Sequence, residues 1–370
     1  RAIPLRATRG ELAVDELVFM NRAFDQVSLV TDQPEDAIEL RVDGEAMAGD
    51  LRYHTTAEGA HSLSAQMERV HMPRPLSDGM TMDSDPTRLP EFHLYVQDLR
   101  YHGLVVGETR IEAYPVADGL RIESVEAESE HMTFQARGDW VSTGVGSRSD
   151  FDILLTAENL GDLISAMALS EVLEGGQTMI HYNAWWPGPP AAFELAHLNG
   201  TMDFSITDGR VLDANPGAGR VLGLFSVAAL PRRLALDFRD VFESGFNFDQ
   251  AGATVNLESG VARTDDFTME STAATLAIEG EADLVNQRFD YRMTVRPGVS
   301  QALPVIGALA AGPPGAAAGL ALQGLLRDAL GDATEARYNI VGPWSDPEVT
   351  RQQAPQAVAE TPGAEDPPGP

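Results

Sequence analysis

Two residue types are missing from this chain of 370 residues: it contains no Cys, and all 26 of its basic residues are Arg, so it contains no Lys. Without Cys the chain has no disulfide, no thiol nucleophile and no Cys-ligated zinc or iron–sulfur site. Without Lys it lacks the Lys of a P-loop, the Schiff-base Lys of pyridoxal phosphate enzymes and the Lys of Ser-x-x-Lys enzymes. These two absences exclude many familiar catalytic centres.

Positive charge is also scarce, because 26 Arg stand against 56 Asp and Glu and the net charge is −30. Such a field repels phosphate backbones and no basic stripe interrupts it, so we expect no nucleic-acid binding. The eight His show no metal-ligand spacing, so we predict no metal site and no cofactor. No Gly-x-Ser-x-Gly turn occurs and the abundant carboxylates single out no acid–base pair, so we predict no enzymatic activity.

Long hydrophobic runs are absent as well. Residues 297–326 carry no charge, but Gly312-Pro313-Pro314-Gly315 divides them into arms shorter than the roughly 20 residues of a membrane span. We expect two apolar helices packed on the end of the fold, with insertion into a membrane interface as the alternative. Residues 1–5 include neither an initiator Met nor an apolar signal-peptide region, so we interpret the chain as a mature form or a piece of a longer protein.

Alternating apolar and polar residues dominate the chain up to about residue 300, which is typical of strands with one apolar and one wet face. Turn dipeptides such as Asp43-Gly44, Asp118-Gly119, Asp208-Gly209 and Ser259-Gly260 predict antiparallel hairpins between these strands. The pattern therefore predicts a mainly β fold with a long antiparallel sheet. The clearest runs are Ile38-x-Leu40-x-Val42, Phe92-x-Leu94-x-Val96, Met132-x-Phe134, Met202-x-Phe204-x-Ile206, Leu276-x-Ile278 and Phe289-x-Tyr291-x-Met293-x-Val295.

Three segments break the alternation and predict α-helices near 158–174, 216–230 and 302–331. The first helix is expected to stop at Gly175-Gly176, since glycines commonly end helices. Asn215-Pro216 supplies an N-cap and a first-turn Pro for the second. The helices therefore gather toward the C-terminal end of the chain.

We divide the chain into three parts on the same grounds. Residues 1–150 are expected to form one β-sheet segment, and residues 151–350 a second β-sheet region that contains the helices. Residues 351–370 are rich in Pro, Ala, Gln and Glu, and we expect them to form a disordered tail.

Tryptophan marks three of the expected strand ends. In both Phe134–Trp140 and Tyr338–Trp344 an expected strand is followed by Gly, one further residue and Trp. This repetition suggests that the chain is built from similar structural modules. Trp185-Trp186 opens a loop that continues as Pro187-Gly188-Pro189-Pro190. We expect this Trp pair to pack at a sheet edge, with stacking on a sugar or other ligand as the alternative.

Six strings in the C-terminal two thirds of the chain point to a known family. They are Trp186-Pro187-Gly188, 215–226, 232–242, 245–249, the run from Leu303-Pro304 through Gly312-Pro313 to Gly319, and 338–347. Taken in this order, over roughly residues 90 to 350, they resemble the C-terminal region of the AsmA-like family of the YhdP type.

The resemblance implies a periplasmic protein of the Gram-negative envelope, anchored in the inner membrane by an N-terminal helix that is missing from this chain. It implies a long curled antiparallel β-sheet with a hydrophobic groove inside. It further implies non-enzymatic transport of phospholipids along this groove between the inner and outer membranes. Outer-membrane or envelope proteins are expected as partners at the C-terminal end. The chain departs from the family in lacking the anchor, most of the family's length and all Lys, and it looks like a C-terminal fragment.

The residues on the apolar face of the strands are the expected lipid-binding residues. They are Phe92, Leu94, Val96, Met132, Phe134, Met202, Phe204, Ile206, Leu276, Ile278, Tyr291, Met293 and Val295. Contact with a membrane, or closure of the groove end, is expected from Leu303, Pro304, Val305, Ile306, Pro313, Pro314, Leu320 and Leu322.

A filled β core predicts the same alternation as an open groove. A structural or adaptor role in outer-membrane assembly, with such a filled core, is therefore the alternative function. A glycan-binding β-sandwich is a third reading of the same pattern.

Overall fold

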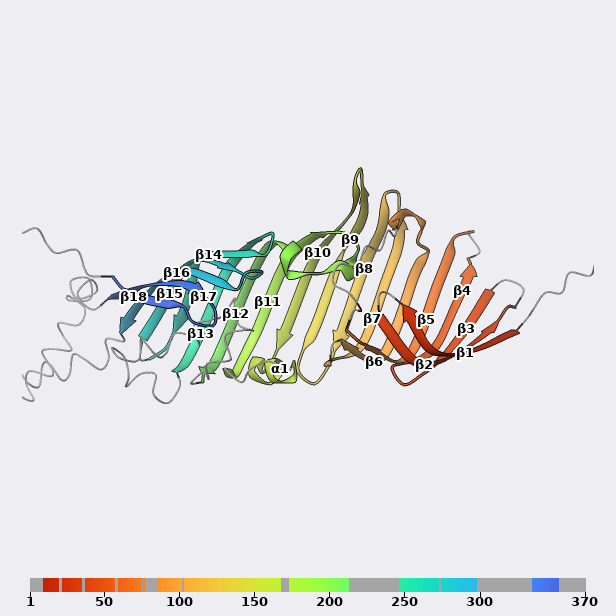
Figure 1. The fold of residues 1–370 in the computed structure, drawn as a ribbon, viewed down its shortest axis with the longest axis horizontal. Coiled ribbons are helices and arrows are strands. Elements are labelled where there is room, and N and C mark those ends of the chain that lie inside the picture. The colour runs from red at the N-terminus through yellow and green to blue at the C-terminus, as the bar shows by residue number, and fades with distance from the viewer. Residues whose placement is uncertain are drawn as a thin grey trace, which may run out of the picture.

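The structure is a computed structural model that describes residues 9–352, except 20–21, 35–36, 57–58, 75, 77–84, 102, 168–172, 213–245, 273 and 298–334. Within these ranges the chain forms one open sheet of 18 strands, and Figure 1 shows the strands side by side along the long axis of the molecule. The prediction of a mainly β fold built on one long sheet is confirmed.

The first ten strands come from residues 9–157. They are β1 (Arg9–Phe19), β2 (Arg22–Asp32), β3 (Ala37–Asp43), β4 (Met47–Thr55), β5 (His61–Met72), β6 (Glu91–Tyr101), β7 (Leu104–Val116), β8 (Gly119–Glu128), β9 (Thr133–Thr143) and β10 (Gly146–Ala157). The other eight are β11 (Leu173–Pro187), β12 (Asn199–Val211), β13 (Phe246–Glu258), β14 (Val261–Glu270), β15 (Ala274–Asp283), β16 (Arg288–Pro297), β17 (Ala336–Pro343) and β18 (Glu348–Arg351).

Each strand pairs with the next one along the chain, and every pair is antiparallel except β5 with β6. A parallel pair needs a crossover connection, which residues 73–90 provide. This connection ends in a short 3₁₀ turn, η1 (Pro86–Arg88), capped by the Asp85 carboxylate, which accepts a hydrogen bond from the Thr87 backbone N–H at 3.0 Å. Leu89 then packs on the buried cluster that contains Trp140. The alternation of apolar and polar residues along the chain did not predict this crossover.

The sheet curls at its N-terminal end. The Arg22 side chain at the start of β2 donates a hydrogen bond to the Pro73 carbonyl, and its guanidinium lies 5.3 Å from the ring centroid of Tyr101 at the end of β6. Because four strand intervals separate β2 from β6, this contact requires the sheet to bend back on itself. Figure 1 shows β2 passing in front of the later strands.

Three of the four turn dipeptides connect or border hairpins. Ser259 and Gly260 join β13 to β14 with φ of 49° and 79°, the left-handed pair of a two-residue hairpin turn. The prediction for Asp208-Gly209 is wrong, because both residues lie inside β12. Glycine is needed there for a different reason: a Cβ on Gly209 would lie 2.3 Å from the Phe248 ring on β13.

The helix expected near 158–174 is shorter than predicted. It is α1 (Leu160–Ala166), capped by the Asn159 side chain, which accepts a hydrogen bond from the Asp162 backbone N–H at 3.1 Å. Gly175 and Gly176 do not end it, because β11 already begins at Leu173. The helices expected near 216–230 and 302–331 lie outside the described residues. Within the described ranges no helix is long and apolar enough to cross a membrane.

The predicted division of the chain near residue 150 falls within β10, which pairs with β9 on one side and β11 on the other. The sheet therefore continues across that position. The expected tail overlaps β18 at Arg351, and residues 353–370 lie outside the described part of the chain.

Candidate functional site

One face of the sheet, called the apolar face below, carries rows of hydrophobic side chains that continue from strand to strand. The register defines one such row at mid-strand, in which each residue is the cross-strand partner of the next. In order from β4 to β13 the row is Leu51, Ala65, Leu94, Ile111, Val125, Ala136, Ile153, Tyr182, Met202 and Val255.

The exposure of this row changes at β11. From β4 to β10 its large members are half-buried, and only its two alanines are buried. From β11 onward Tyr182, Met202 and Val255 are all buried. At a strand spacing of about 4.8 Å the half-buried part alone is about 30 Å long. It offers a continuous apolar surface that the protein does not fully cover.

The thirteen expected lipid-binding residues follow this division only in part, since Val96 is buried and Tyr291 is half-buried. The twelve that lie on strands share the apolar face through the cross-strand register, and Met132 directly precedes β9. Four of the thirteen are half-buried: Phe92, Leu94, Phe134 and Tyr291. The others are buried: Val96, Met132, Met202, Phe204, Ile206, Leu276, Ile278, Met293 and Val295. The expected groove-end residues between 303 and 322 lie outside the described residues.

Sequence reasoning missed most of the half-buried row. Leu51 stands between Asp50 and Arg52, and Ile111 between Arg110 and Glu112, so the alternation that marks them was present. Ile153 lies in the unbroken apolar run Ile153-Leu154-Leu155, where no alternation indicates which side chain points to which face of the sheet. Cross-strand register is what assigns these residues to one surface.

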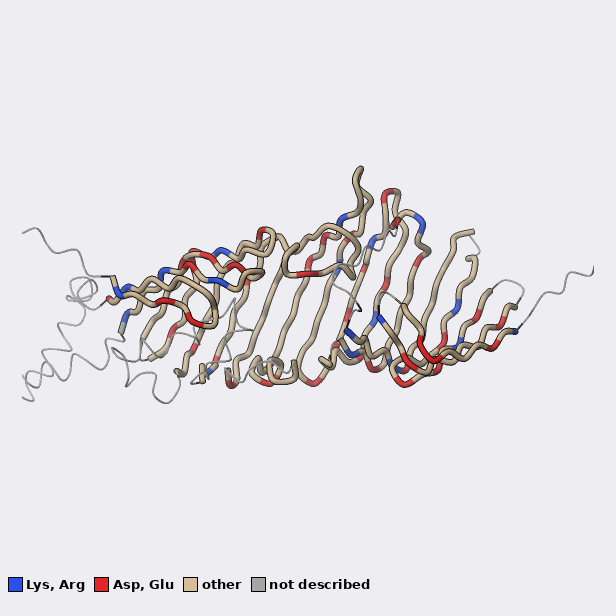
Figure 2. The backbone as a smooth tube through the Cα atoms, viewed as in Figure 1, with Lys and Arg blue, Asp and Glu red and all other residues tan. Residues whose placement is uncertain are grey.

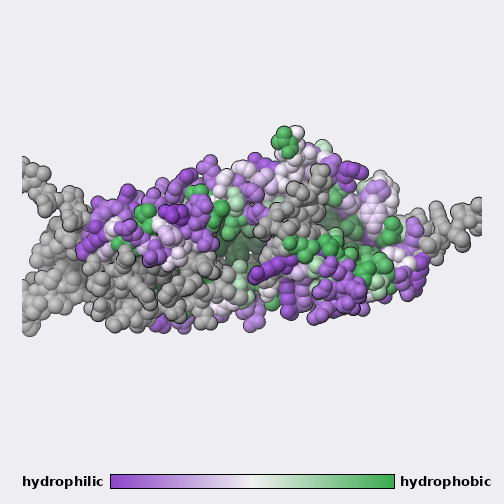
Figure 3. Space-filling model, viewed as in Figure 1, coloured by the Kyte–Doolittle hydropathy of each residue, from purple (hydrophilic) through white to green (hydrophobic). Residues whose placement is uncertain are grey.

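Figure 3 shows hydrophobic side chains lining a hollow in the middle of the molecule. Two tyrosines on this face, Tyr182 and Tyr291, bring no charge into it at neutral pH. Burial raises the pKa of Tyr182 to about 12, and burial also raises the pKa of Tyr291 above its usual range. The Tyr182 hydroxyl donates a hydrogen bond to the Asn199 carbonyl at 3.1 Å. The apolar face is thus suited to hydrocarbon rather than to ions.

The opposite, wet face carries paired charges. Arg41 lies 2.8 Å from Asp50, Arg121 lies 3.0 Å from Asp139, and all four side chains are largely exposed. Such exposed pairs are worth about 0–1 kcal/mol each, so they contribute to solubility more than to stability. Figure 2 shows charged residues along both rims, with acidic ones in excess.

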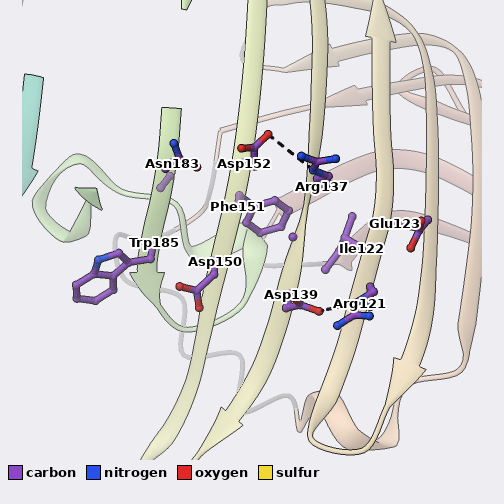
Figure 4. A pocket seen from close by; sticks show the side chains of 12 residues that line it. Arg121, Ile122, Glu123, Arg137, Asp139, Asp150, Phe151, Asp152, Asn183 and Trp185 are labelled. Carbon is purple, nitrogen blue, oxygen red and sulfur yellow. Dashed lines mark hydrogen bonds and ion pairs between the residues drawn. The ribbon is translucent and has the colours of Figure 1, made fainter. Parts of the chain in front are cut away.

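A shallow depression of about 450 Å³ lies on the wet face across β8 to β11 (Figure 4). Two ion pairs cross it: besides Arg121 with Asp139, Arg137 lies 3.8 Å from Asp152. The Arg148 guanidinium lies 4.3 Å from the ring centroid of Trp185, one of the lining residues. Across the described ranges no group of three or more His, Asp or Glu has the arrangement of a metal site.

Trp186 packs at the end of β11, as predicted, whereas Trp185 is half-buried on the wet face. Trp186 is buried on the apolar face and stacks on Phe151 with 5.3 Å between ring centroids. In both Gly-x-Trp strings the Gly is the cross-strand partner of a Phe. Gly138 lies opposite Phe151 in the middle of β9, and Gly342 lies opposite Phe289 next to the end of β17.

Comparison with known proteins gives the family. A family model described as "YhdP protein" matches residues 1–349. The "Intermembrane phospholipid transporter YhdP" of Escherichia coli (strain K12) is 30% identical over 215 residues, which are 58% of this chain and 17% of that protein. The chain therefore matches only a small part of that relative's length. No solved structure matches it. Since the family model covers nearly the whole chain, the protein belongs to the AsmA-like YhdP family.

Proposed function

We propose that this chain carries phospholipids between the inner and outer membranes without enzymatic chemistry, with the acyl chains lying on the half-buried part of the apolar face. The observation that carries the proposal is the continuous row from Leu51 to Ile153. Family membership supports it, because the E. coli relative is named as an intermembrane phospholipid transporter.

The dimensions of the face fit this cargo. The hydrocarbon core of a bilayer is about 30 Å thick, so an acyl chain occupies about 15 Å. The half-buried row is about twice that length, since it crosses seven strands at about 4.8 Å per interval. A lipid can therefore move along the row and keep its acyl chains against hydrophobic side chains, at a gain of about 25 cal/mol per Å² removed from water.

The location and partners follow from the same proposal. We place the protein in the periplasm, with the full-length protein anchored in the inner membrane and the C-terminal end directed toward the outer membrane or its envelope proteins. The strongly acidic wet face faces water in this arrangement. The expected groove-end segment between Leu303 and Leu322 remains our proposed contact with a membrane or with the end of the groove.

A structural or adaptor role is the second candidate, and one observation favours it. From β11 onward the apolar face is buried, as Met202, Leu276 and Met293 show. A filled core of this kind serves an assembly role as well as it serves the end of a transport path.

Extraction of the purified chain with organic solvent, followed by mass spectrometry, separates the two candidates. Prepared without detergent, the chain is expected to release phospholipid. Changing both Leu94 and Ile153 to Asp places charges on the half-buried row and is expected to lower the lipid content several-fold. The matched control is Gln97→Asp, which adds a charge to an exposed position of the same strand β6 and is expected to leave the lipid content unchanged.

Circular dichroism of each variant shows whether its sheet is intact. Wild-type protein that is free of lipid, and that takes up none from phosphatidylethanolamine and phosphatidylglycerol vesicles, contradicts the transport proposal and favours the structural role.

A further inference from the structure

All four tryptophans of the chain lie at one rim of the sheet. Trp140 is near the end of β9, Trp185 and Trp186 are near the end of β11, and Trp344 directly follows β17. Because every neighbouring pair from β6 onward is antiparallel, these three odd-numbered strands run in the same direction and end at the same rim. The opposite rim has no tryptophan.

Three of the four face the apolar side and are buried, with exposed fractions of 5% for Trp140, 3% for Trp186 and 6% for Trp344. Trp140 and Trp186 are the two cross-strand partners of Ser149. Trp344 stacks on Phe289 with 5.6 Å between ring centroids. The rim therefore has large aromatic rings where the apolar face meets the loops.

The indole N–H groups of these three residues differ in one respect. The Trp186 Nε1–H donates a hydrogen bond to the Pro189 carbonyl at 3.0 Å. The Nε1 atoms of Trp140 and Trp344 are equally buried, but neither has a hydrogen-bond acceptor in the described structure. A buried donor without an acceptor costs about 1–3 kcal/mol, and few occur in native proteins. Two such donors at the same rim of one apolar face call for a common explanation.

We propose that the indole N–H groups of Trp140 and Trp344, which lie eight strand intervals apart, each donate a hydrogen bond to oxygen atoms at the head-group end of a separately bound glycerophospholipid. This inference rests on the proposed function and adds an orientation to it: the lipid heads lie at the rim where β9, β11 and β17 end, and the acyl chains extend from there along the apolar face. Tryptophan has the same role at membrane surfaces, where its ring sits among hydrocarbon and its N–H among polar groups.

The indole N–H signals of the ¹⁵N-labelled chain test the proposal directly. Four signals are expected and are assigned with single Trp→Phe variants. On titration with dihexanoyl phosphatidylglycerol below its micelle concentration, the signals of Trp140 and Trp344 are expected to move downfield as their N–H groups gain an acceptor. The Trp186 signal, already hydrogen-bonded, and the Trp185 signal, on the wet face, are expected to stay in place.

Affinity for the same lipid provides a second readout. Trp140→Phe keeps an aromatic ring and removes the donor, so binding is expected to weaken about 2- to 10-fold, the worth of one hydrogen bond. Trp185→Phe on the wet face is the matched control and is expected to bind as wild type does. If lipid binds while the Trp140 and Trp344 signals stay in place, the orientation is wrong and the proposed function stands. If no lipid binds to wild type, the proposed function itself fails.

Discussion

The apolar face has the same alternation in the two halves of the molecule but a different packing. From β1 to β10 the buried hydrophobic residues form small separate clusters, such as Phe24 with Val27 and Val42, and some neighbours on this face are widely exposed, Leu12 at 55% and Ile38 at 46%. From β11 to β17 they belong to one large cluster, in which Met293 is fully buried.

The two halves also differ in the side-chain contacts on this face. The mid-strand row of the N-terminal half consists of Leu, Ile, Val and Ala. In the C-terminal half aromatic rings contact one another across strands, with ring centroids 6.3 Å apart for Phe204 and Phe267 and 5.6 Å apart for Phe289 and Trp344. Aromatic rings also occur in the N-terminal half, where Phe92 and Phe134 are only half-buried. Hydrophobic alternation alone therefore does not distinguish a groove from a core.

The largest expected effect on the free energy of unfolding comes from placing a carboxylate on the apolar face, in one variant for each half. Met293→Asp puts a charge into a fully buried position and is expected to lower the free energy of unfolding by about 4 kcal/mol or more. Leu94→Asp, at a half-buried position, is expected to cost about 1 kcal/mol and to act on lipid content instead. Urea unfolding followed by circular dichroism measures both. Equal losses of unfolding free energy in the two variants would contradict the difference in packing between the two halves.

Truncation of large side chains gives the next largest effect. Phe289→Ala removes a ring that is 3% exposed and stacks on both Tyr291 and Trp344, so it is expected to cost about 3–5 kcal/mol. Leu51→Ala, at a half-buried position, is expected to cost less than about 1.5 kcal/mol because little packing is lost. The shift of the urea midpoint reports each value. A larger loss for Leu51→Ala would show that the N-terminal half is packed as tightly as the C-terminal half.

The junction of the two halves is tested by a pair of glycines in the β9–β10 hairpin. A Cβ on Gly138 would lie 2.1 Å from the Asp150 carbonyl oxygen and 2.8 Å from the Phe151 ring, so Gly138→Ala is expected to cost about 2 kcal/mol. A Cβ on Gly144 meets nothing within 4 Å, so Gly144→Ala is expected to cost less than about 0.5 kcal/mol. Thermal unfolding of the two variants provides the comparison, and equal melting temperatures would contradict it.

The smallest effect concerns pH in the C-terminal half. Hydrogen bonds from Arg337 at 2.6 Å and Arg296 at 2.9 Å hold the pKa of the Glu335 carboxyl below its usual value of 4.5. Because the folded-state pKa is depressed, the stabilisation is present above pH 4.5 and is lost as the pH falls through the folded-state value. We expect Glu335→Gln to melt slightly below wild type at pH 7 and to match it at pH 3. A difference that persists at pH 3 would exclude this ion pair as its source.

The sequence predicted the strands and their faces well, because alternation reports directly on the two sides of a sheet. The string Tyr338–Trp344 correctly marked a strand end, whereas β9 continues past Trp140 to Thr143. The turn predicted at Asp208-Gly209 was wrong, because glycine is needed there to leave space for the Phe248 ring and not to form a turn. The sequence did not indicate the crossover between β5 and β6, because a polar crossover connection and a polar hairpin loop have similar residue patterns.

The candidate site was predictable only in part. Leu94 and Met293 both lie in regular alternating runs, yet one is half-buried and the other fully buried. What separates them is the size and position of neighbours on other strands, which are set by register. The unpaired indoles of Trp140 and Trp344 likewise depend on which carbonyls lie within reach. Such properties belong to the folded sheet and not to any single segment.

Site-specific photocrosslinking to lipid tests the central claim most directly. A photoreactive side chain is placed at Leu94 or Ile153 on the half-buried row, at Tyr95 on the opposite face of β6, and at Met293 in the buried half. The chain is then irradiated in envelopes that contain radiolabelled phospholipid. We expect label at Leu94 and Ile153 and none at Tyr95 or Met293. Equal label at Leu94 and Tyr95, or none at any of the four positions, would contradict it.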